Sequence, residues 1–303
     1  MQSVVAMRDK QLSKVMVTGA GGQLGSALCS SAPSSIEVCA LTRSECDICD
    51  PAAVAAALDK QRPELLINAA AYTAVDRAEE ESAAAFAANA EAPGILSRAC
   101  AQRGIRFFHV STDFVFDGLS SSPYAVDAQT SPLGVYGHSK QAGEQATLES
   151  GADALILRTG WVYSHDGQNF MRTMLRLHES HDEISVVSDQ VGTPTDALSL
   201  AGALWAAAHR RGLSGIYHWS DAGVCSWYDF AVAIGEEAKA QGLLSKVAVV
   251  KPIRTQDYPT PAQRPAYSVL DKTRSWLDLE IPPTHWRSQL RAVLTRLKEA
   301  DHA

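Results

Sequence analysis

The sequence predicts an α/β fold in which a doubly wound parallel sheet is joined to a smaller C-terminal lobe. From residue 14 onward, short apolar runs alternate with longer helical segments. A glycine-rich segment directly follows the first apolar run, and after residue 220 the alternation weakens while proline becomes more frequent. Strands that alternate with helices form parallel sheets with right-handed crossovers.

The first half of the chain supplies most of the expected sheet. Each expected strand is a short run of mainly apolar residues. These strands cover 14–19, 36–42, 64–71, 105–112 and 154–163. The expected helices between them cover 22–32, 51–63 and 82–104, and a further helix carries Tyr136. Pro51 stands at the start of the second helix, where proline is well tolerated.

Two more strand-like runs, 184–190 and 215–221, flank an alanine-rich helix at 196–211. We therefore expect residues 14–160 and 184–212 to form the sheet unit, and residues 161–183 and 213–303 to form the smaller lobe. Residues 1–13 are expected to be a flexible N-terminal extension.

Composition and charge exclude several classes of protein. A net charge of −7 gives no electrostatic footprint for nucleic acid or an anionic membrane surface. No apolar run reaches the roughly 18 residues of a membrane span. The start of the chain lacks the pattern of a signal peptide, so we expect a cytoplasmic protein.

Cys46 and Cys49 form a C-x-x-C pair. A zinc site would need a second pair of ligands, and none follows at a suitable spacing. Ordinary reduced thiols are therefore expected, with a redox dithiol as the alternative.

The glycine-rich segment indicates a dinucleotide site. Gly19, Gly22 and Gly25 form a G-x-x-G-x-x-G between the first expected strand and the first expected helix. Glycine lets the backbone turn tightly and approach a pyrophosphate, and the helix N-terminus then offers free N–H groups to that anion. The position between strand and helix gives the motif its specificity.

The end of the second strand indicates which nicotinamide cofactor is preferred. An acidic residue there would bind the ribose 2′-hydroxyl, whereas an arginine accommodates a 2′-phosphate. The sequence has Thr42 and Arg43 at this point, which favours NADPH and leaves NADH possible. Asp47 and Ile48 follow at a spacing suited to flanking the adenine, and Ala70 and Ala71 end the third strand with small side chains.

A candidate catalytic set follows the fourth strand. Tyr136 and Lys140 are four residues apart, on one face of the expected helix. Thr112 and Asp113 stand at the carboxyl end of the fourth strand, where ligands of doubly wound sheets bind. A free tyrosine has a pKa near 10 and is a poor acid–base group near neutral pH, so we expect the Lys140 charge to lower the pKa of Tyr136. Thr112 is expected to orient the phenol and the carbonyl oxygen of a ketone substrate.

These motifs resemble those of the extended short-chain dehydrogenase/reductases, which have a Rossmann-type sheet. They resemble the dTDP-4-dehydrorhamnose reductase family more closely. The similar segments are TGAGGQLG, INAAAYTAVDRAE, STDFVFDG, YGHSKQAGE, LRTGWVY and VSDQVGTPT. The resemblance implies an NADPH-dependent oxidoreductase that reduces the C4 keto group of a dTDP-linked 6-deoxy-L-hexose, giving dTDP-L-rhamnose.

The resemblance also implies roles for single residues. Tyr136 would donate the proton to the sugar O4, Lys140 would be its partner, and Thr112 would position it. Asp113 and Trp161 would touch the sugar, the latter with its aromatic face. The implied cofactor contacts are Gly22, Gln23 and Leu24 at the pyrophosphate, Asp47 and Ile48 at the adenine, and Ala70, Ala71 and Tyr72 on the nicotinamide side. Arg264 is a candidate phosphate contact, with a surface salt bridge as the alternative.

Three positions depart from the family pattern. Ala27 stands where some members have a glutamate of a magnesium site that bridges two subunits, so we expect no such metal and a monomer or weak homodimer. Tyr72 replaces a common histidine and Phe114 a common tyrosine. A reductase of another dTDP-4-keto-deoxysugar therefore stays open, as does a non-catalytic subunit like the regulatory beta subunit of methionine adenosyltransferase.

Overall fold

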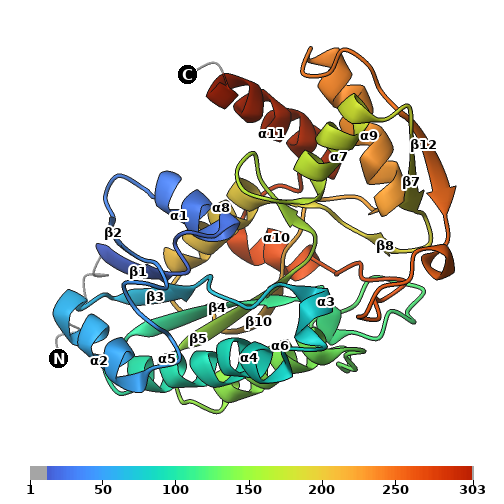
Figure 1. Ribbon diagram of the computed structural model, residues 1–303. Helices are drawn as coiled ribbons and strands as arrows, with labels where there is room; N and C mark the ends of the chain where they lie inside the picture. Colours follow the sequence, from blue (N-terminus) through green and yellow to red (C-terminus); the bar gives the residue numbers. More distant parts are fainter. Residues whose placement is uncertain (1–11, 302–303) are drawn as a thin grey trace, which may run out of the picture.

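The computed structural model describes residues 12–301 and is built around one six-stranded parallel sheet (Figure 1). Its spatial order is β2-β1-β3-β4-β5-β10, and every pairing is parallel. The strands are β1 (Lys14–Thr18), β2 (Glu37–Leu41), β3 (Leu65–Asn68), β4 (Arg106–Thr112), β5 (Ala154–Thr159) and β10 (Gly215–His218). The predicted α/β fold class is confirmed.

Helices cover both faces of this sheet, which explains why β3 and β5 are buried at every position. On one face lie α1 (Gln23–Ser30), α8 (Ala197–Ala208) and α10 (Thr273–Leu279) (Figure 1). On the other lie α2 (Pro51–Gln61), α4 (Ser82–Phe86), η1 (Ala87–Glu91), α5 (Ala92–Ala101) and α6 (Val135–Leu148). The short α3 (Val75–Ala78) follows β3.

The helix expected at 82–104 contains one turn of π-helix, η1. Pro93 lies just after this turn and has no N–H to donate to the Asn89 carbonyl four residues earlier. That carbonyl faces α6, where a Cβ on Gly143 would lie 2.0 Å from it. The wider helical turn directs Asn89 into the interior, where it is fully buried. Such π-bulges are frequent at functional sites.

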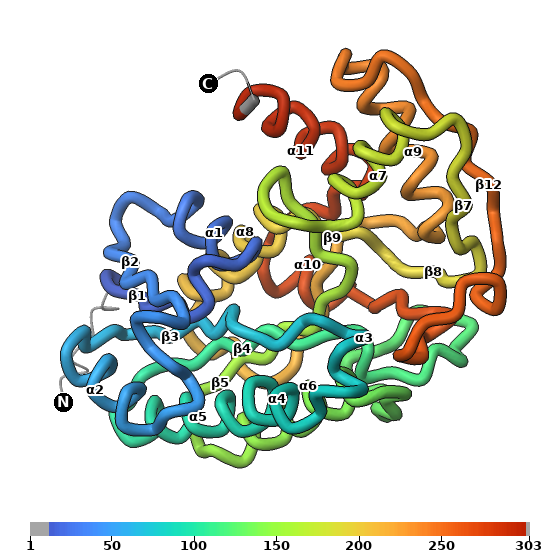
Figure 2. Tube along the Cα trace, in the orientation of Figure 1, coloured from blue at the N-terminus to red at the C-terminus, as the bar shows by residue number. Residues whose placement is uncertain are grey.

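The second lobe packs around α7 (Phe170–Ser180), α9 (Trp227–Ala240) and α11 (Trp286–Asp301). Three short strand pairs complete it: β7 (Glu183–Val187) with β12 (Val249–Ile253), β6 (Val162–Tyr163) with β9 (Thr195–Asp196), and β8 (Val191–Gly192) with β11 (Cys225–Ser226). Two segments of the chain form this lobe. Figure 2 shows the yellow-green segment that carries α7 beside the orange to red segment that carries α9 and α11. Two 3₁₀ turns, η2 (Asp113–Val115) and η3 (Thr255–Asp257), lie in the connections.

Three details differ from the sequence expectation. The run 154–163 is split after Thr159, because Trp161 adopts a left-handed conformation with φ +51° and turns the chain out of the sheet. Residues 184–187, expected in the sheet unit, pair with β12 of the lobe. The run from residue 215, expected in the lobe, instead joins the sheet as β10. Apolar periodicity identifies a strand but not its partner.

The predicted N-terminal extension lies almost wholly outside the described residues; at its end, the Ser13 N–H donates to Glu64 Oε2 at 2.8 Å. No helix within residues 12–301 is long and apolar enough to span a membrane.

Candidate active site

The strand order reverses between β1 and β3, and the glycine turn lies at this point. Gly19 has φ +73°, and a Cβ there would lie 2.5 Å from the Ala70 nitrogen at the end of β3. A Cβ on Gly25 would lie 2.1 Å from the Gly19 carbonyl oxygen. Gly22 is the N-cap of α1 and offers no side chain to its first turn. These glycines form a close turn, and the free N–H groups of the first turn of α1, which follows it, suit a pyrophosphate.

The side chains of Gln23 and Leu24 point away from this turn. Gln23 Oε1 accepts hydrogen bonds from Ser164 Oγ at 3.1 Å and Asn169 Nδ2 at 2.9 Å, both in the second lobe. Leu24 is buried in the core beside α8. Leu24 could therefore contact a pyrophosphate only through its backbone N–H, whereas Gln23 keeps its side-chain Nε2 as well as its backbone N–H.

The end of β2 lies beside the glycine turn, because the Ala20 N–H donates to the Leu41 carbonyl at 3.1 Å. Arg43 is exposed there. Asp47 is also exposed and accepts the Cys49 N–H at 3.0 Å, whereas Ile48 is buried under α2. Arg43 is thus accessible to a ligand beside the turn, whereas the Ile48 side chain packs into the core.

The end of β3 is held by Asn89 of η1. Asn89 Oδ1 accepts the Tyr72 N–H at 2.8 Å, while its Nδ2 donates to the Tyr72 carbonyl at 3.0 Å and to Ser139 Oγ at 3.1 Å. The Tyr72 hydroxyl donates to Glu81 Oε2 at 2.7 Å. Asn89 therefore fixes the backbone that follows Ala70 and Ala71 and ties it to α6.

Thr112 and Asp113 lie together at the end of β4. Thr112 Oγ1 donates to Asp113 Oδ1 at 3.1 Å and accepts the Phe114 N–H at 3.2 Å. Burial raises the pKa of Asp113 to about 6, although its hydrogen bonds act in the opposite direction. A Cβ on Gly160 would lie 2.5 Å from Asp113 Oδ2, so this glycine makes room for the carboxylate.

Tyr136 is brought to Thr112 by the first turn of α6. Burial raises the pKa of Tyr136 to about 12, and its hydrogen bond with Thr112 lowers it in part. The lowering of the Tyr136 pKa that we expected from Lys140 is not found, because the Lys140 amine donates to the Val110 carbonyl at 2.6 Å instead. The phenol is thus held in its protonated form, which is the form that can donate a proton.

Lys140 is 2% exposed and lies one turn beyond Tyr136 on α6. Burial lowers its pKa to about 8, and the charge of Glu144 opposes that change. Its Nζ lies 3.4 Å from Nε2 of His109, a buried residue of β4. The lysine is therefore enclosed between α6 and the sheet rather than exposed at the surface.

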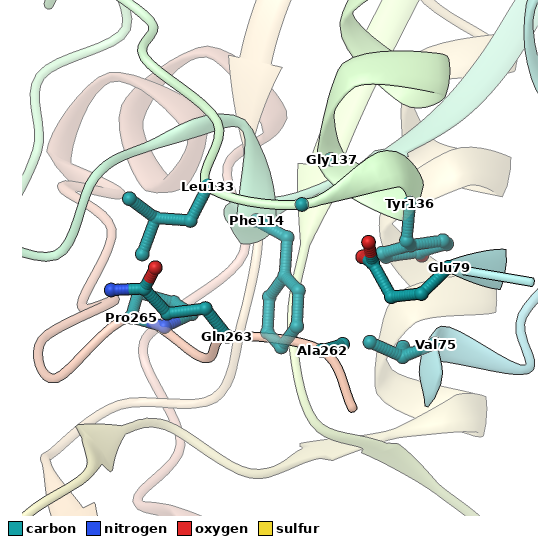
Figure 3. Close-up of a pocket in the computed structure, with 10 residues that line it drawn as sticks. Val75, Glu79, Phe114, Leu133, Tyr136, Gly137, Ala262, Gln263 and Pro265 are labelled. Atoms are coloured by element: carbon teal, nitrogen blue, oxygen red, sulfur yellow. The ribbon is translucent and has the colours of Figure 1, made fainter. Parts of the chain in front are cut away.

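A small pocket lies beside Tyr136 (Figure 3). In Figure 3 the Phe114 ring stands at its centre, with Tyr136 and Glu79 on one side and Leu133 and Pro265 on the other. The Phe114 ring meets the Tyr136 ring edge-on, with centroids 5.7 Å apart. Glu79 Oε1 accepts the Val135 N–H at 2.9 Å and so holds the start of α6.

Trp161 and Arg264 lie where the second lobe meets the sheet unit, Trp161 directly after Gly160, which packs on Asp113. The Trp161 indole stacks on Trp227 with centroids 3.4 Å apart and planes 5° apart. Arg264 forms a bidentate pair with Asp76, with Nη1–Oδ1 3.0 Å and Nη2–Oδ2 2.8 Å. The salt-bridge alternative for Arg264 is thus present, across the boundary between lobe and sheet unit.

Comparison with known proteins places this geometry in a family. Residues 13–299 match the family model described as RmlD substrate binding domain. A protein of Aggregatibacter actinomycetemcomitans named dTDP-4-dehydrorhamnose reductase is 41% identical over 289 residues, covering 93% of this chain and 98% of the relative. The chain belongs to the dTDP-4-dehydrorhamnose reductase family. The resemblance seen in the sequence motifs is confirmed.

Other members of the family are similar along their whole length. The dTDP-4-dehydrorhamnose reductase of Bacillus anthracis, solved in complex with NADP, superimposes with a TM-score of 0.89 at 32% identity, covering 94% of this chain and 99% of that one. A Streptomyces antibioticus protein, described as a probable dTDP-4,6-dihydroxy-2-methyloxan-3-one 4-ketoreductase, is 40% identical and covers 95% of this chain and 96% of its own.

Three residues of the site were missed by the sequence argument: Glu79, Asn89 and His109. His109 interrupts the apolar run Phe-Phe-His-Val, and a polar residue inside a buried strand needs a partner. Asn89 stands four residues before Pro93 within a helical segment, which marks a distorted turn. Glu79 offered no comparable signal, because its contact with Val135 spans 56 residues.

Proposed function

We propose that this protein reduces the C4 keto group of dTDP-4-dehydro-L-rhamnose to dTDP-L-rhamnose, using NADPH. The observation that carries the proposal is the meeting of Thr112 and Tyr136 at the carboxyl end of β4, on the same edge of the sheet as the glycine turn at the switch point. The names of the relatives support the same reaction.

The residues present fit an NADP cofactor. Gly19 and Gly25 leave backbone exposed where any Cβ would collide with it, which suits close approach of a pyrophosphate. Arg43 would pair with a 2′-phosphate and distinguish NADPH from NADH. When bound, the reduced nicotinamide supplies the hydride that reaches C4 of the sugar.

The side chains of β4 and α6 supply the rest of the reaction. The Thr112 hydroxyl would orient the sugar O4, and the Tyr136 phenol would donate its proton to that oxygen as the carbonyl becomes an alcohol. A pKa of about 12 keeps Tyr136 protonated before the step. Lys140, one turn away, would stabilise the phenolate that remains.

We further propose a division of labour between the two units. The six-stranded sheet with its helices would hold the cofactor, and the lobe around α7, α9 and α11 would hold the nucleotide-sugar. The Asp76–Arg264 and Gln23–Asn169 contacts join the two units at the site. Closing the lobe onto the sheet would exclude water from the hydride.

The test is a reductase assay with a choice of cofactor and sugar. Freshly generated dTDP-4-dehydro-L-rhamnose is added with NADPH or NADH, and absorbance of the reduced nicotinamide is followed. Faster oxidation of NADPH is expected, with the Arg43→Ala variant losing that preference. If none of the dTDP-4-ketosugars causes oxidation of the cofactor, the proposal is overturned and a regulatory subunit is favoured.

A second candidate is reduction of another dTDP-4-keto-deoxysugar. Phe114 favours it, because a ring without a hydroxyl stands against Tyr136 in the pocket where the family commonly has tyrosine. The Streptomyces relative is named for such a substrate. A comparison of kcat/KM between dTDP-4-dehydro-L-rhamnose and a 2- or 3-deoxygenated analogue distinguishes the two candidates.

A further inference from the structure

A row of polar side chains crosses three neighbouring strands below the carboxyl end of the sheet. Thr18 of β1, Asn68 of β3 and His109 of β4 are successive register partners, and each is at most 1% exposed. We call these three residues the polar row. Burial of polar groups is unfavourable unless they are hydrogen-bonded, so the pairing within the row is tightly constrained.

The orientation of the Asn68 amide is fixed by its neighbours. Its Oδ1 accepts hydrogen bonds from Thr18 Oγ1 at 2.8 Å and from the Ala70 N–H at 3.2 Å. A backbone N–H can only donate, so the atom facing Ala70 must be the amide oxygen. The amide nitrogen therefore faces His109, with Nδ2–Nδ1 3.1 Å.

This orientation determines the tautomer of His109. The Asn68 nitrogen carries only donors, so His109 Nδ1 must accept, and the hydrogen of the neutral ring must be on Nε2. Burial and the charge of Lys140 both hold the pKa of His109 well below its usual range, which keeps the ring neutral.

The Nε2–H then faces the amine of Lys140 at 3.4 Å. If the amine is charged, two donors oppose each other, and the distance is longer than an ordinary hydrogen bond. If the amine is neutral, its lone pair can accept the Nε2–H, while Nζ still donates to the Val110 carbonyl at 2.6 Å. The tautomer thus favours the neutral amine.

We propose that His109 is a positioning residue for Lys140. The polar row holds the His109 imidazole with its Nε2–H towards Lys140 Nζ, and this hydrogen stabilises the neutral amine. The inference rests on the proposed function for the role of Lys140 beside Tyr136. Because its neutral form is stabilised, the Lys140 ammonium would give up a proton more readily when the Tyr136 phenolate is reprotonated after the reduction: an N–H bond of the ammonium breaks and the O–H bond of the phenol forms. A proton from bulk solvent would then restore the ammonium.

Other charges around Lys140 do not cancel this effect. Glu144, one turn further along α6, raises the pKa of the lysine. Its carboxylate is held by Arg158 of β5, with Nε–Oε1 2.9 Å and Nη2–Oε2 2.7 Å. Asp113 of η2 acts on Tyr136 rather than on the lysine. Burial therefore dominates, and the pKa of Lys140 stays near 8.

The first experiment needs no variant. In the wild-type protein, ¹⁵N chemical shifts of the His109 side chain are followed between about pH 6 and 9. A neutral ring with a protonated Nε2 and no titration is expected. A protonated Nδ1, or a ring that becomes charged in this range, would overturn the proposal, whether or not any sugar is reduced.

The second experiment inverts the row with Asn68→Asp. A carboxylate accepts from Thr18, Ala70 and His109 alike, so the ring should carry its hydrogen on Nδ1 and offer Nε2 to the Lys140 ammonium. The ¹³Cε titration midpoint of Lys140 should rise by about one unit or more. The control is Thr147→Val, a buried residue of α6 whose hydroxyl has no partner among the described residues.

An unchanged Lys140 midpoint in Asn68→Asp, or an unchanged tautomer of His109, contradicts the proposal. Thermal unfolding of each variant identifies loss of fold, in which case the wild-type nitrogen spectrum alone decides. If the enzyme turns over, the pH dependence of kcat should shift with the lysine midpoint. Lack of turnover with every sugar counts against the proposed function and leaves both spectra interpretable.

Discussion

The two sides of the candidate site are built in different ways. On the sheet side, positions are fixed by backbone: Gly19 and Gly25 close the turn against neighbouring main chain, and the polar row joins register partners of adjacent strands. On the lobe side, long-range side-chain contacts bring the residues in, as between Trp161 and Trp227 or Asp76 and Arg264.

This difference separates chemistry from recognition. Changes on the sheet side should lower turnover or cofactor affinity, because the groups there would face the nicotinamide and the reacting oxygen. Changes on the lobe side should raise KM for the sugar and leave the cofactor bound. The experiments that follow test this separation.

The largest effect is expected from Tyr136→Phe. Without the phenolic hydroxyl no side chain donates the proton to O4, and general acid catalysis contributes about 10²–10⁴-fold to a rate. Turnover should fall by that factor, while NADPH affinity measured by fluorescence titration should change little. Near-normal turnover in this variant would sink the assigned mechanism.

A smaller but still severe effect is expected from Gly25→Ala. The new Cβ would lie 2.1 Å from the Gly19 oxygen, so the turn must shift and NADPH affinity should fall at least about 10-fold. Gly202→Ala is the matched control, because nothing lies within 4 Å of its Cβ on α8. That variant should bind NADPH normally and gain about 0.5–1 kcal/mol in unfolding free energy.

The sheet side was also the more predictable from sequence. Strands β1 to β4 follow local apolar runs, and the glycine turn has a fixed spacing that any reader of the sequence can find. Tyr136 meets Thr112 at the carboxyl end of β4, the edge of the sheet where ligands of such folds bind, and Lys140 lies one turn further along α6; their catalytic roles stay predictions. Their electrostatics was not predictable, because the direction of the Lys140 amine depends on His109 and Val110.

The lobe side was less predictable for a physical reason. An apolar run can pair with whichever edge is free, so residues 184–187 joined β12 and the run from residue 215 joined the sheet. Trp161, where the run 154–163 leaves the sheet, stacks on a residue 66 positions later, Trp227. Side-chain contacts at such separation leave no periodic signal in the sequence.

A moderate effect is expected from Arg264→Ala, and its comparison with Asp76→Asn sharpens the assignment. The Asp76–Arg264 pair is partly exposed, so its loss should cost less than about 1 kcal/mol of stability in either variant. If Arg264 binds a substrate phosphate, only Arg264→Ala should raise KM for the sugar, by about 10-fold. Equal changes in KM for both variants would show that Arg264 acts only through its salt bridge with Asp76.

Removal of divalent metal ions is expected to have no effect. The Ala27 side chain has no oxygen to offer a metal and is packed in the core beside α8. In residues 12–301, no group of three or more His, Cys, Asp and Glu side chains is arranged to hold a metal ion. Chelation should therefore leave turnover and sedimentation velocity unchanged, and a loss of either would show that a metal acts here.

A single substitution should not restore the metal-bridged arrangement. Ala27→Glu would place a carboxylate in the apolar contact between α1 and α8, where a buried unpaired charge is strongly unfavourable. The variant should unfold at a lower temperature and gain no magnesium-dependent association. Association that appears with magnesium would mean that α1 can turn this position outward, and the packing argument for Ala27 would then fail.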